Sequence, residues 1–537
     1  MFEVQNQPPP IEPYNLFTSD AVLRDAVRRE GANWAGRELT ELGSTLGKPE
    51  TVQLGFDANK FPPQLRSLDR YGHRLDEVEF HPAWHQLLEI ALEAGLHSSP
   101  WANPKPGAHV ARAAGTYMLG QIESGAYCPL AMTYGSVPTL RHAPQIAEEW
   151  LPRIYSREYD HRFRPARLKT SALVGMGMTE NQGGSDLRTN TTRAQPSADG
   201  SFRLYGHKWF MSAPMCDAFL VLAQAPNGLS CFLMPRWTPD GERNAILILR
   251  LKDKLGNRSN ASSEVEFHGA YAQLVGEEGR GIPTIIEMGN YTRLDCCIGS
   301  SALMRQAVAQ AIHHARNRIA FQKKLIDQPL MTNVLADLAL ESEAATVLTI
   351  WLARAYDENN DAALAIRRIV TPAAKFWICK RTPSLTYEAM EVLGGSGYIE
   401  DSIMPRLYRE APVNSIWEGS GNIMCLDVLR ALERTPNAAE VVRSELGEAK
   451  DARIKAFAAR IEKRIAARDR VDESQARALV RDFIVALQGS LLVRHAPSNV
   501  SDAFCASRLD GEGAPVFGLL PRGLDARGIA ERAGPAN

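Results

Sequence analysis

The sequence predicts an α+β multidomain fold in which a central β domain separates two helical domains and a further helical segment follows. The first ~160 residues place apolar side chains near a 3.6-residue period, which is typical of amphipathic helices. Between Lys169 and Ala272, short runs rich in Val, Leu, Phe and Tyr alternate with Asp-Gly and Pro-Asn-Gly turns, and no helical pattern lies between them. From Ile282 the helical period returns. We therefore expect helical residues 1–165, an antiparallel β domain over 166–275, a helical bundle over 276–436, and a C-terminal helical domain over 437–537.

Length and composition bound the class of protein. A chain of 537 residues is too long for one hydrophobic core, and 45% hydrophobic and 23% charged residues are ordinary for a soluble protein. No stretch of about 20 apolar residues could span a bilayer, and the N-terminal residues lack the pattern of a signal peptide. The eight cysteines form no CxxC pair, which favours reduced thiols and a cytoplasmic location. The net charge of −1 requires any DNA-binding surface to be local.

Individual helices follow from the same periodicity. The N-terminal part predicts helices over Asp20–Glu30, Trp84–Ala94 and Pro144–Ile154. The later part predicts helices over Ser300–Phe321, Met331–Tyr356, Ala362–Val392 and Asn422–Ala431. Because proline lacks the backbone N–H that an interior helical position uses, we expect a break near Pro372.

Two motifs lie in the predicted β domain. Gly177–Leu187 (GMTENQGGSDL) combines glycines with hydroxyl side chains, so its backbone can approach a ligand and donate to an anion or carbonyl; a polar turn is the alternative. In Gly206–Ser212 (GHKWFMS), Trp209 and Phe210 are adjacent. Since side chains alternate along a strand, we expect one ring on each face, one in the core and one forming a flat wall, unless both only pack the sheet.

Two further motifs lie in the predicted helical bundle. Arg318 and Phe321 are three residues apart and would share one helix face, where a guanidinium beside an aromatic ring suits a phosphate near a planar group. A charged helix end is the alternative. Gly394–Gly397 (GGSG) is typical of a turn that ends a helix.

Glu418 differs from these segments because it combines a carboxylate with an apolar setting. It follows Ile416 and Trp417 and precedes Gly-Ser-Gly at a predicted helix start. Desolvation there should raise the pKa of its carboxyl group, which suits a general base.

Together, the strings MTENQGGSD, GHKWFMS, RIAF, LGGSGY and WEGSGN resemble, in this order, the signatures of the acyl-CoA dehydrogenase family over roughly residues 110–430. The resemblance implies the acyl-CoA dehydrogenase fold, non-covalent FAD, a homo-oligomer that is expected to be a tetramer, and Glu418 as the base that removes the substrate α-proton while the flavin takes the hydride. It implies a cofactor site made of Met178, Thr179, Ser185, Phe210, Met211, Ser212, Trp417, Ser420 and Asn422. It places Arg318, Phe321, Gly394 and Gly395 at the adenine-pyrophosphate end of a cofactor held mainly by a neighbouring subunit, and Thr292 and Arg293 near the acyl-CoA entrance.

Some positions depart from the family pattern. Gln322 replaces a usual glycine, Glu391 a usual glutamine and Ser420 a common threonine. We still expect the protein to bind FAD despite these changes. They weigh against efficient oxidation of an ordinary acyl-CoA. No metal site is predicted, because the adjacent pairs His313-His314 and Cys296-Cys297 point in different directions on a helix.

The C-terminal segment carries an amphipathic pattern with basic residues. The run 441–470 should be helical, with Ile454, Phe457, Ile461 and Ile465 forming an apolar seam, and a second helix should cover Ser474–Leu492. A solvated basic face is the bland interpretation. The branch of the family that has an added C-terminal domain and a role in the adaptive response to alkylation implies contact with double-stranded DNA without sequence specificity, and Arg460, Lys463, Arg464 and Arg468 are the residues predicted to make it.

Two functions remain open at this stage. In the first, the protein oxidises an acyl thioester or a small alkylating agent by flavin chemistry. In the second, it is a DNA-binding protective protein whose FAD is structural or redox-sensing. The intact Glu418 favours chemistry, and the added C-terminal domain favours DNA.

Overall fold

The computed structural model describes residues 3–435, 437–466, 473–510 and 516–535. The chain divides into two compact units. Unit 1 comprises Met1–Pro49, Lys105–Gln121 and Arg293–Asn537, and unit 2 comprises Glu50–Pro104 and Ile122–Thr292. Each unit therefore combines segments that the sequence assigned to different domains, and the division into four domains stays a prediction.

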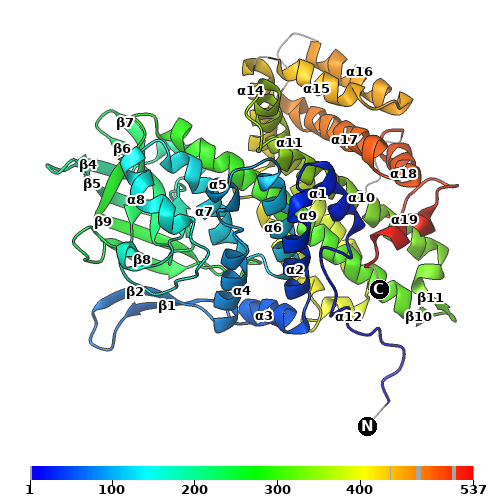
Figure 1. The fold of residues 1–537 in the computed structure, drawn as a ribbon, viewed down its shortest axis with the longest axis horizontal. Coiled ribbons are helices and arrows are strands. Elements are labelled where there is room, and N and C mark those ends of the chain that lie inside the picture. Colours follow the sequence, from blue (N-terminus) through cyan, green and yellow to red (C-terminus); the bar gives the residue numbers. More distant parts are fainter. Residues whose placement is uncertain (1–2, 436, 467–472, 511–515, 536–537) are drawn as a thin grey trace. The chain divides into compact units, whose positions relative to one another are not determined.

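Unit 2 contains the β domain. Its strands are β3 (Val174–Gly177), β4 (Arg193–Pro196), β5 (Phe202–Ser212), β6 (Ala218–Ala225), β7 (Gly228–Pro235), β8 (Ile246–Leu251) and β9 (Ser262–Val275). Antiparallel pairs join β5 to β9, β9 to β7 and β7 to β6, and β3 and β4 close the ring because each pairs antiparallel with β5 and parallel with β6. The expectation of a purely antiparallel domain was thus wrong for these two short strands. Figure 1 shows this sheet with β8 along one edge of β9.

The helices of unit 2 come from the N-terminal part of the chain. They are α3 (Pro49–Lys60), α4 (Pro82–Glu93), α5 (Ser99–Ala102), α7 (Tyr127–Leu140) and α8 (Pro144–Ile154). The predicted helices over Trp84–Ala94 and Pro144–Ile154 are confirmed. An antiparallel hairpin of β1 (Gln64–Leu68) and β2 (Arg74–Glu79) was not predicted, and it lies beside β8.

Unit 1 is helical. It holds α1 (Ala21–Arg29), α2 (Gly36–Leu46), α6 (Ala108–Ile122), α10 (Pro329–Arg354), α11 (Asp361–Val392), α12 (Gly395–Tyr398), α13 (Met404–Glu410) and α14 (Gly421–Arg434). The helix α9 (Gly281–Asn317) runs through both units, and the short strands β10 (Ile319–Ala320) and β11 (Lys323–Lys324) follow it. The helix α11 continues through Pro372 and Pro383, so the expected break is wrong. Packing against α10, α14 and α17 stabilises the helix despite the missing backbone donors.

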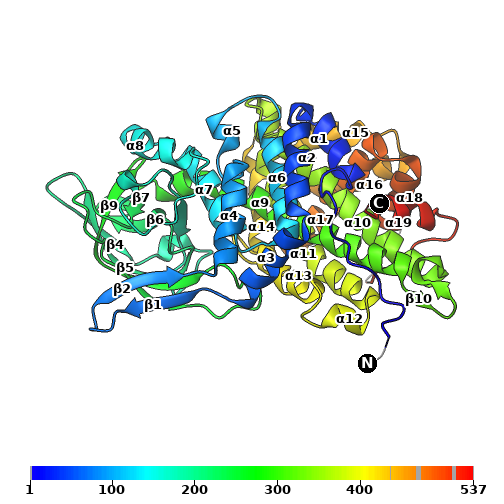
Figure 2. The same ribbon diagram turned by 60° about the horizontal axis from the view of Figure 1, so that its bottom comes forward.

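The C-terminal helices also belong to unit 1. They are α15 (Ala438–Gly447), α16 (Ala452–Ala466), α17 (Ala476–His495), α18 (Ser498–Arg508) and α19 (Ala526–Ala533). The predicted long helix over 441–470 is interrupted between α15 and α16. Ile454, Phe457 and Ile461 are buried, which confirms the apolar seam for these residues. Helix α16 packs on α17. Figure 2 shows these C-terminal helices with α10 and α19.

Across the described residues, no helix has the length and apolar character needed to cross a membrane. All eight cysteines are free and buried.

Candidate functional site

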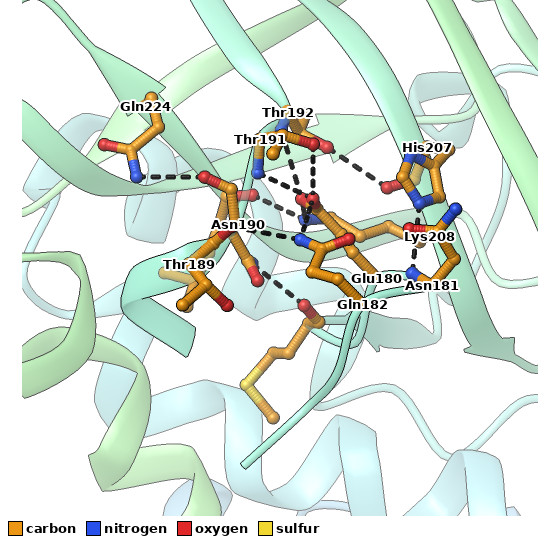
Figure 3. A network of polar contacts seen from close by, with 12 residues as sticks. Glu180, Asn181, Gln182, Thr189, Asn190, Thr191, Thr192, His207, Lys208 and Gln224 are labelled. Carbon is orange, nitrogen blue, oxygen red and sulfur yellow. Dashed lines mark hydrogen bonds and ion pairs between the residues drawn. The ribbon is translucent and has the colours of Figure 1, made fainter. Parts of the chain in front are cut away.

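A fully buried ion pair connects the two motifs of the β domain, and the sequence did not predict it. The Nζ atom of Lys208 lies 2.8 Å from Oε1 of Glu180, and both side chains are 0% exposed. Lys208 also donates to the carbonyl of Leu222 at 2.8 Å. The Glu180 carboxylate accepts further bonds from the backbone N–H groups of Thr191 and Thr192, from the Thr191 hydroxyl and from the Gln182 amide. Figure 3 shows these donors converging on Glu180.

This pair shifts the pKa of both partners for different reasons. Burial alone would raise the pKa of Glu180, but the Lys208 charge and the converging donors lower it well below its usual range. Lys208 has only one other acceptor, so burial prevails and lowers its pKa to about 8 despite the opposing effect of Glu180. The pair thereby holds the glycine-rich loop of the first motif against strand β5 of the second.

The glycine-rich loop offers open backbone and exposed hydroxyl groups. Gly183 has φ +149°, and a Cβ atom added there would meet nothing within 4 Å. A Cβ atom at Gly184 would instead lie 2.4 Å from Oγ1 of Thr179, so this position requires glycine. Ser185 is exposed, whereas the carbonyls of Met178 and Thr179 accept bonds from Asn190 and from the Trp209 backbone. The loop can therefore present N–H and O–H donors to a polar ligand.

A β-bulge in β5 changes how the second motif is displayed. Lys208 and Met211 are three positions apart, while their partners on β9, Val265 and Ser263, are two positions apart. Lys208 and Met211 both point into the core, and the intervening rings of Trp209 and Phe210 both contact the Lys252 ammonium, at 3.9 and 4.4 Å from the ring centroids.

One expectation for this strand was consequently wrong, and the cofactor contact of Met211 stays a prediction. The adjacent rings do not face opposite sides, because the bulge interrupts the alternation on which that prediction relied. The Met211 side chain, predicted to contact the cofactor, is 0% exposed. Phe210 is 49% exposed, and Ser212, two positions further along the strand, has its hydroxyl 3.2 Å from that of Ser262. An exposed ring with neighbouring hydroxyl groups and an open glycine loop fits a flat, polar-edged cofactor such as the flavin part of FAD.

In unit 1, Glu418 lies on a loop with a strained backbone. Its φ is +59°, a left-handed conformation that is costly for a residue with a side chain. Two buried cations hold the loop through its carbonyl oxygens. The Nζ atom of Lys375, on α11, donates to Asn414 at 2.9 Å and to Gly419 at 2.8 Å. The Nε atom of Arg293 donates to the carbonyl of Glu418 itself at 3.1 Å.

The neighbours of Glu418 are bonded to protein groups. The indole of Trp417 donates to Oδ1 of Asn414 at 3.0 Å, Ser420 precedes α14 at its N-cap position, and Oδ1 of Asn422 accepts from Nε of Arg477 at 2.8 Å. The glutamate side chain is half-buried rather than enclosed. Its predicted raised pKa stays a prediction.

The predicted substrate pair occupies the middle of α9 and is buried. The Thr292 hydroxyl donates within its own helix to Met288 and Gly289, as buried helical threonines often do. Arg293 forms an ion pair with Asp427 at 3.1 Å in addition to its bond to the Glu418 loop. A role for this pair at a substrate entrance stays a prediction; the geometry shows Arg293 bonded to the loop that carries Glu418.

The residues predicted for the adenine-pyrophosphate end do not share a helix face. Helix α9 ends at Asn317, and a tight β10–β11 hairpin follows with Phe321 and Gln322 at positive φ. Phe321 is 92% exposed, and Arg318 donates to the carbonyl of Asn6. The expected helix face is wrong because the turn carries Phe321 away from the axis of α9. The predicted glycine turn after α11 is confirmed at Gly394, whereas Gly395 already begins the short helix α12; both are exposed, and a Cβ atom at either would meet nothing within 4 Å.

The four predicted DNA contacts differ from one another. Arg460 and Lys463 are exposed on α16, with the Arg460 guanidinium 4.1 Å from the Phe457 ring centroid. Arg464 forms an ion pair with the buried carboxylate of Asp482 on α17. Arg468 lies outside the described residues.

Comparisons with known proteins agree with this architecture. Residues 6–161 match the family model of the adaptive response protein AidB N-terminal domain, residues 175–270 the acyl-CoA dehydrogenase middle domain, and residues 279–433 the acyl-CoA dehydrogenase C-terminal domain. The chain is 47% identical to AidB of Escherichia coli K12, over 95% of each chain. It is 30% identical to acyl-CoA dehydrogenase family member 11 of Caenorhabditis elegans, over 79% of this chain and 72% of the relative.

A solved structure shows the same likeness in three dimensions. The C. elegans protein ACDH-11, crystallised in complex with C11-CoA, superposes with a TM-score of 0.84 at 27% identity, covering 99% of this chain and 92% of that one. The predicted fold and FAD cofactor are thereby confirmed at the level of the family. The chain belongs to the acyl-CoA dehydrogenase family of FAD-dependent oxidoreductases, in its AidB-type branch.

Proposed function

We propose that this protein oxidises the acyl chain of a CoA thioester, with Glu418 as the base that removes the α-proton. The carrying observation is the strained Glu418 loop held through its carbonyls by Lys375 and Arg293. A non-glycine residue persists at positive φ only where its surroundings enforce it, and such positions cluster at functional sites. The C. elegans protein ACDH-11 supports the substrate class, because its crystal structure is a complex with C11-CoA.

Ser185, Phe210 and Ser212 would hold the flavin ring and its polar groups in unit 2, where the exposed ring and the open glycine loop fit it. When bound, FAD supplies the acceptor for the hydride that leaves the β-carbon. Glu418 accepts the α-proton, and Lys375 and Arg293 keep the carboxylate-bearing loop in one conformation.

The test is single-turnover flavin reduction by an undecanoyl-CoA probe in the purified, FAD-loaded protein. Glu418→Gln should slow flavin bleaching by about 10²–10⁴-fold, the usual contribution of a general base, while FAD content is unchanged. Glu433→Gln, a change of the same kind at an exposed residue of α14, is the matched control and should behave as wild type. Equal bleaching rates in the Glu418→Gln variant and the wild type would place the base elsewhere.

We propose as a second function that the C-terminal helices bind double-stranded DNA without sequence preference and that the protein thereby protects DNA against alkylation. The supporting observation is that Arg460 and Lys463 project from α16 while its apolar side packs on α17. In this alternative the flavin is structural or redox-sensing.

The DNA proposal predicts a change in salt dependence. Replacing Arg460 and Lys463 with Ser should reduce the slope of log K against log salt by ~0.9 for each phosphate that is no longer neutralised, equally for unrelated duplexes. The matched control replaces Lys323 and Lys324, both exposed on β11, with Ser and so removes the same charge. Identical slopes in the α16 variant and the wild type would refute a DNA surface on this helix.

Two further expectations also belong to this proposal. We propose a homotetramer, which size-exclusion chromatography with light scattering tests directly. We also propose a cytoplasmic location, which the eight free, buried cysteines support.

A further inference from the structure

Unit 2 contains a cavity of about 280 Å³ that none of the family motifs contributes to. Its walls come from the β1–β2 hairpin, from the segment 159–173 and from the residues that follow β5 and β7. The β1–β2 hairpin, which the sequence did not predict, lies against β8 and forms one wall of this cavity. The lining combines guanidinium groups with aromatic rings.

Arg236, directly after β7, is the buried cation of this cavity. It is 6% exposed, and its guanidinium donates through Nη2 to the backbone carbonyl of Asp76 at 2.8 Å. Its Nε atom is buried without a hydrogen-bond partner, and no carboxylate of the described residues lies within ion-pair distance. Burial lowers the pKa of Arg236 to about 10, which still leaves it charged at neutral pH. Asp76, Glu77 and Asp217 attract this charge from beyond ion-pair distance, and a buried charge without a directly bonded counter-ion is costly, so an anion from outside the chain would be favoured here.

The carboxylates around the cavity do not supply that anion because other cations already engage them. Asp76 binds Arg74, Asp217 binds Lys169, and Asp160 binds Arg162. Glu77 is likewise paired with Arg243, and Glu79 is exposed at the end of β2. The histidine His85 cannot serve as a cation, since burial and the neighbouring His161 lower its pKa to about 4.

A second guanidinium and two aromatic rings complete the arrangement. The Nε atom of Arg164 is also buried without a partner, and its nearest ion-pair contact, to Asp160, is long at 3.8 Å. The Arg236 guanidinium lies 5.1 Å from the ring centroid of Phe163, which packs against Trp237. We propose that this cavity binds a small organic oxyanion, a carboxylate or a phosphate monoester carried on a flat apolar body, with Arg236 and Arg164 donating to its oxygens and Trp237 beside its apolar part.

The test uses benzoate and phenyl phosphate as probes, with neutral benzamide as the comparison ligand, in ligand-observed NMR titrations of the FAD-loaded protein in chloride-free buffer. We expect saturable binding of at least one anion, with a dissociation constant on the order of 1 mM or tighter for so small a ligand, and at least tenfold weaker binding of benzamide. The stronger of the two anions assigns the carboxylate or the phosphate chemistry.

Variants decide whether this cavity is the site. Arg164→Gln and Arg236→Lys should each weaken binding by about 10–100-fold, because each removes hydrogen bonds from a charged donor. Arg258→Gln, at an exposed arginine elsewhere in unit 2, should bind as wild type. If Arg236→Lys loses FAD or melts early, Arg164→Gln decides the outcome, since its side chain is partly exposed. Absence of saturable binding of both anions, or wild-type affinity in the Arg164→Gln variant, would overturn the proposal.

Discussion

Replacing Lys208 with Met tests whether the buried ion pair holds the glycine-rich loop and strand β5 of the β domain together. The change removes the ammonium at similar length and leaves the Glu180 carboxylate fully buried with its remaining donors from Gln182, Thr191 and Thr192. Removing one partner of a buried pair costs about 3–5 kcal/mol, because the other charge is left uncompensated. For a unit of roughly 150–250 residues, each kcal/mol lowers the melting temperature by about 2–4 °C, so we expect a fall of roughly 6–20 °C.

The reciprocal variant, Glu180→Gln, should be milder for a reason that the structure supplies. Lys208 can release its proton, because burial lowers its pKa to about 8 even beside Glu180, and loss of the Glu180 charge lowers that pKa further. The unpaired lysine can therefore become neutral, whereas the carboxylate left by Lys208→Met is held charged by its converging donors. Differential scanning fluorimetry, with flavin release as a second signal, measures both variants against Lys324→Met at an exposed site on β11. A Lys208→Met variant that melts within about 2 °C of wild type and retains its FAD would refute this account of the pair.

Three other predictions follow from the geometry. Lys375→Met should lower the rate of flavin reduction while FAD content stays constant, since two carbonyls of the Glu418 loop lose a charged donor. Lys375→Arg should restore part of the rate. Equal rates in the methionine variant and the wild type would contradict this prediction. The pKa of Glu180 is lower in the folded protein than its ordinary value of 4.5. Its contribution to stability is therefore present above pH 4.5 and lost as the pH falls through the folded pKa. The melting temperature of Glu180→Gln, measured over acid pH, should depend less on pH than that of the wild type. Arg464→Ser should lower the melting temperature without changing the slope of log K against log salt for DNA binding, because Arg464 is paired with Asp482. A reduced slope would show that Arg464 contacts phosphate.

The sequence predicted those parts of the fold that follow from periodicity or from a known motif order. Helix α8 was placed to the residue, and the strands of unit 2 lie inside the predicted β region, the β1–β2 hairpin apart. That hairpin was missed because its few apolar residues, Leu65 and Leu68, then Leu75 and Val78, are three positions apart, so no period-two alternation marks these largely exposed strands. Residues 318–321 were assigned to the predicted helix Ser300–Phe321, with Arg318 and Phe321 on one face, yet α9 ends at Asn317 and the chain turns at Phe321.

The candidate site was predicted as strings of residues and not as contacts. Glu180 was part of a recognised string, but its partner Lys208 is 28 residues away, and neither periodicity nor spacing shows that the two meet. The bulge in β5 likewise depends on the register with β9, a non-local property. The one sequence signal for a buried ion pair was a lysine among apolar strand residues, because a lysine is almost never fully buried unless it is paired.

Backbone strain connects these motifs to function independently of any comparison. Among the described residues, the non-glycine positions with positive φ fall into two classes. Asn6, Asp76, Asn257 and Asn437 are of the types that tolerate the left-handed region through local hydrogen bonds. The others are Ala213, Phe321, Gln322 and Glu418, and each lies in or directly after a segment that the sequence singled out.

Such positions cost on the order of 1–3 kcal/mol each, and glycine would relieve the cost. Strain that is retained where glycine is the easy substitute indicates that the side chain is needed there. The observation is sharpest for Glu418, because two buried cations enforce the conformation through its own carbonyl and that of Gly419. A residue with a purely structural role would gain stability from the change to glycine, whereas a base would lose its chemistry, so Glu418→Gly should raise the melting temperature while it abolishes flavin reduction by acyl-CoA.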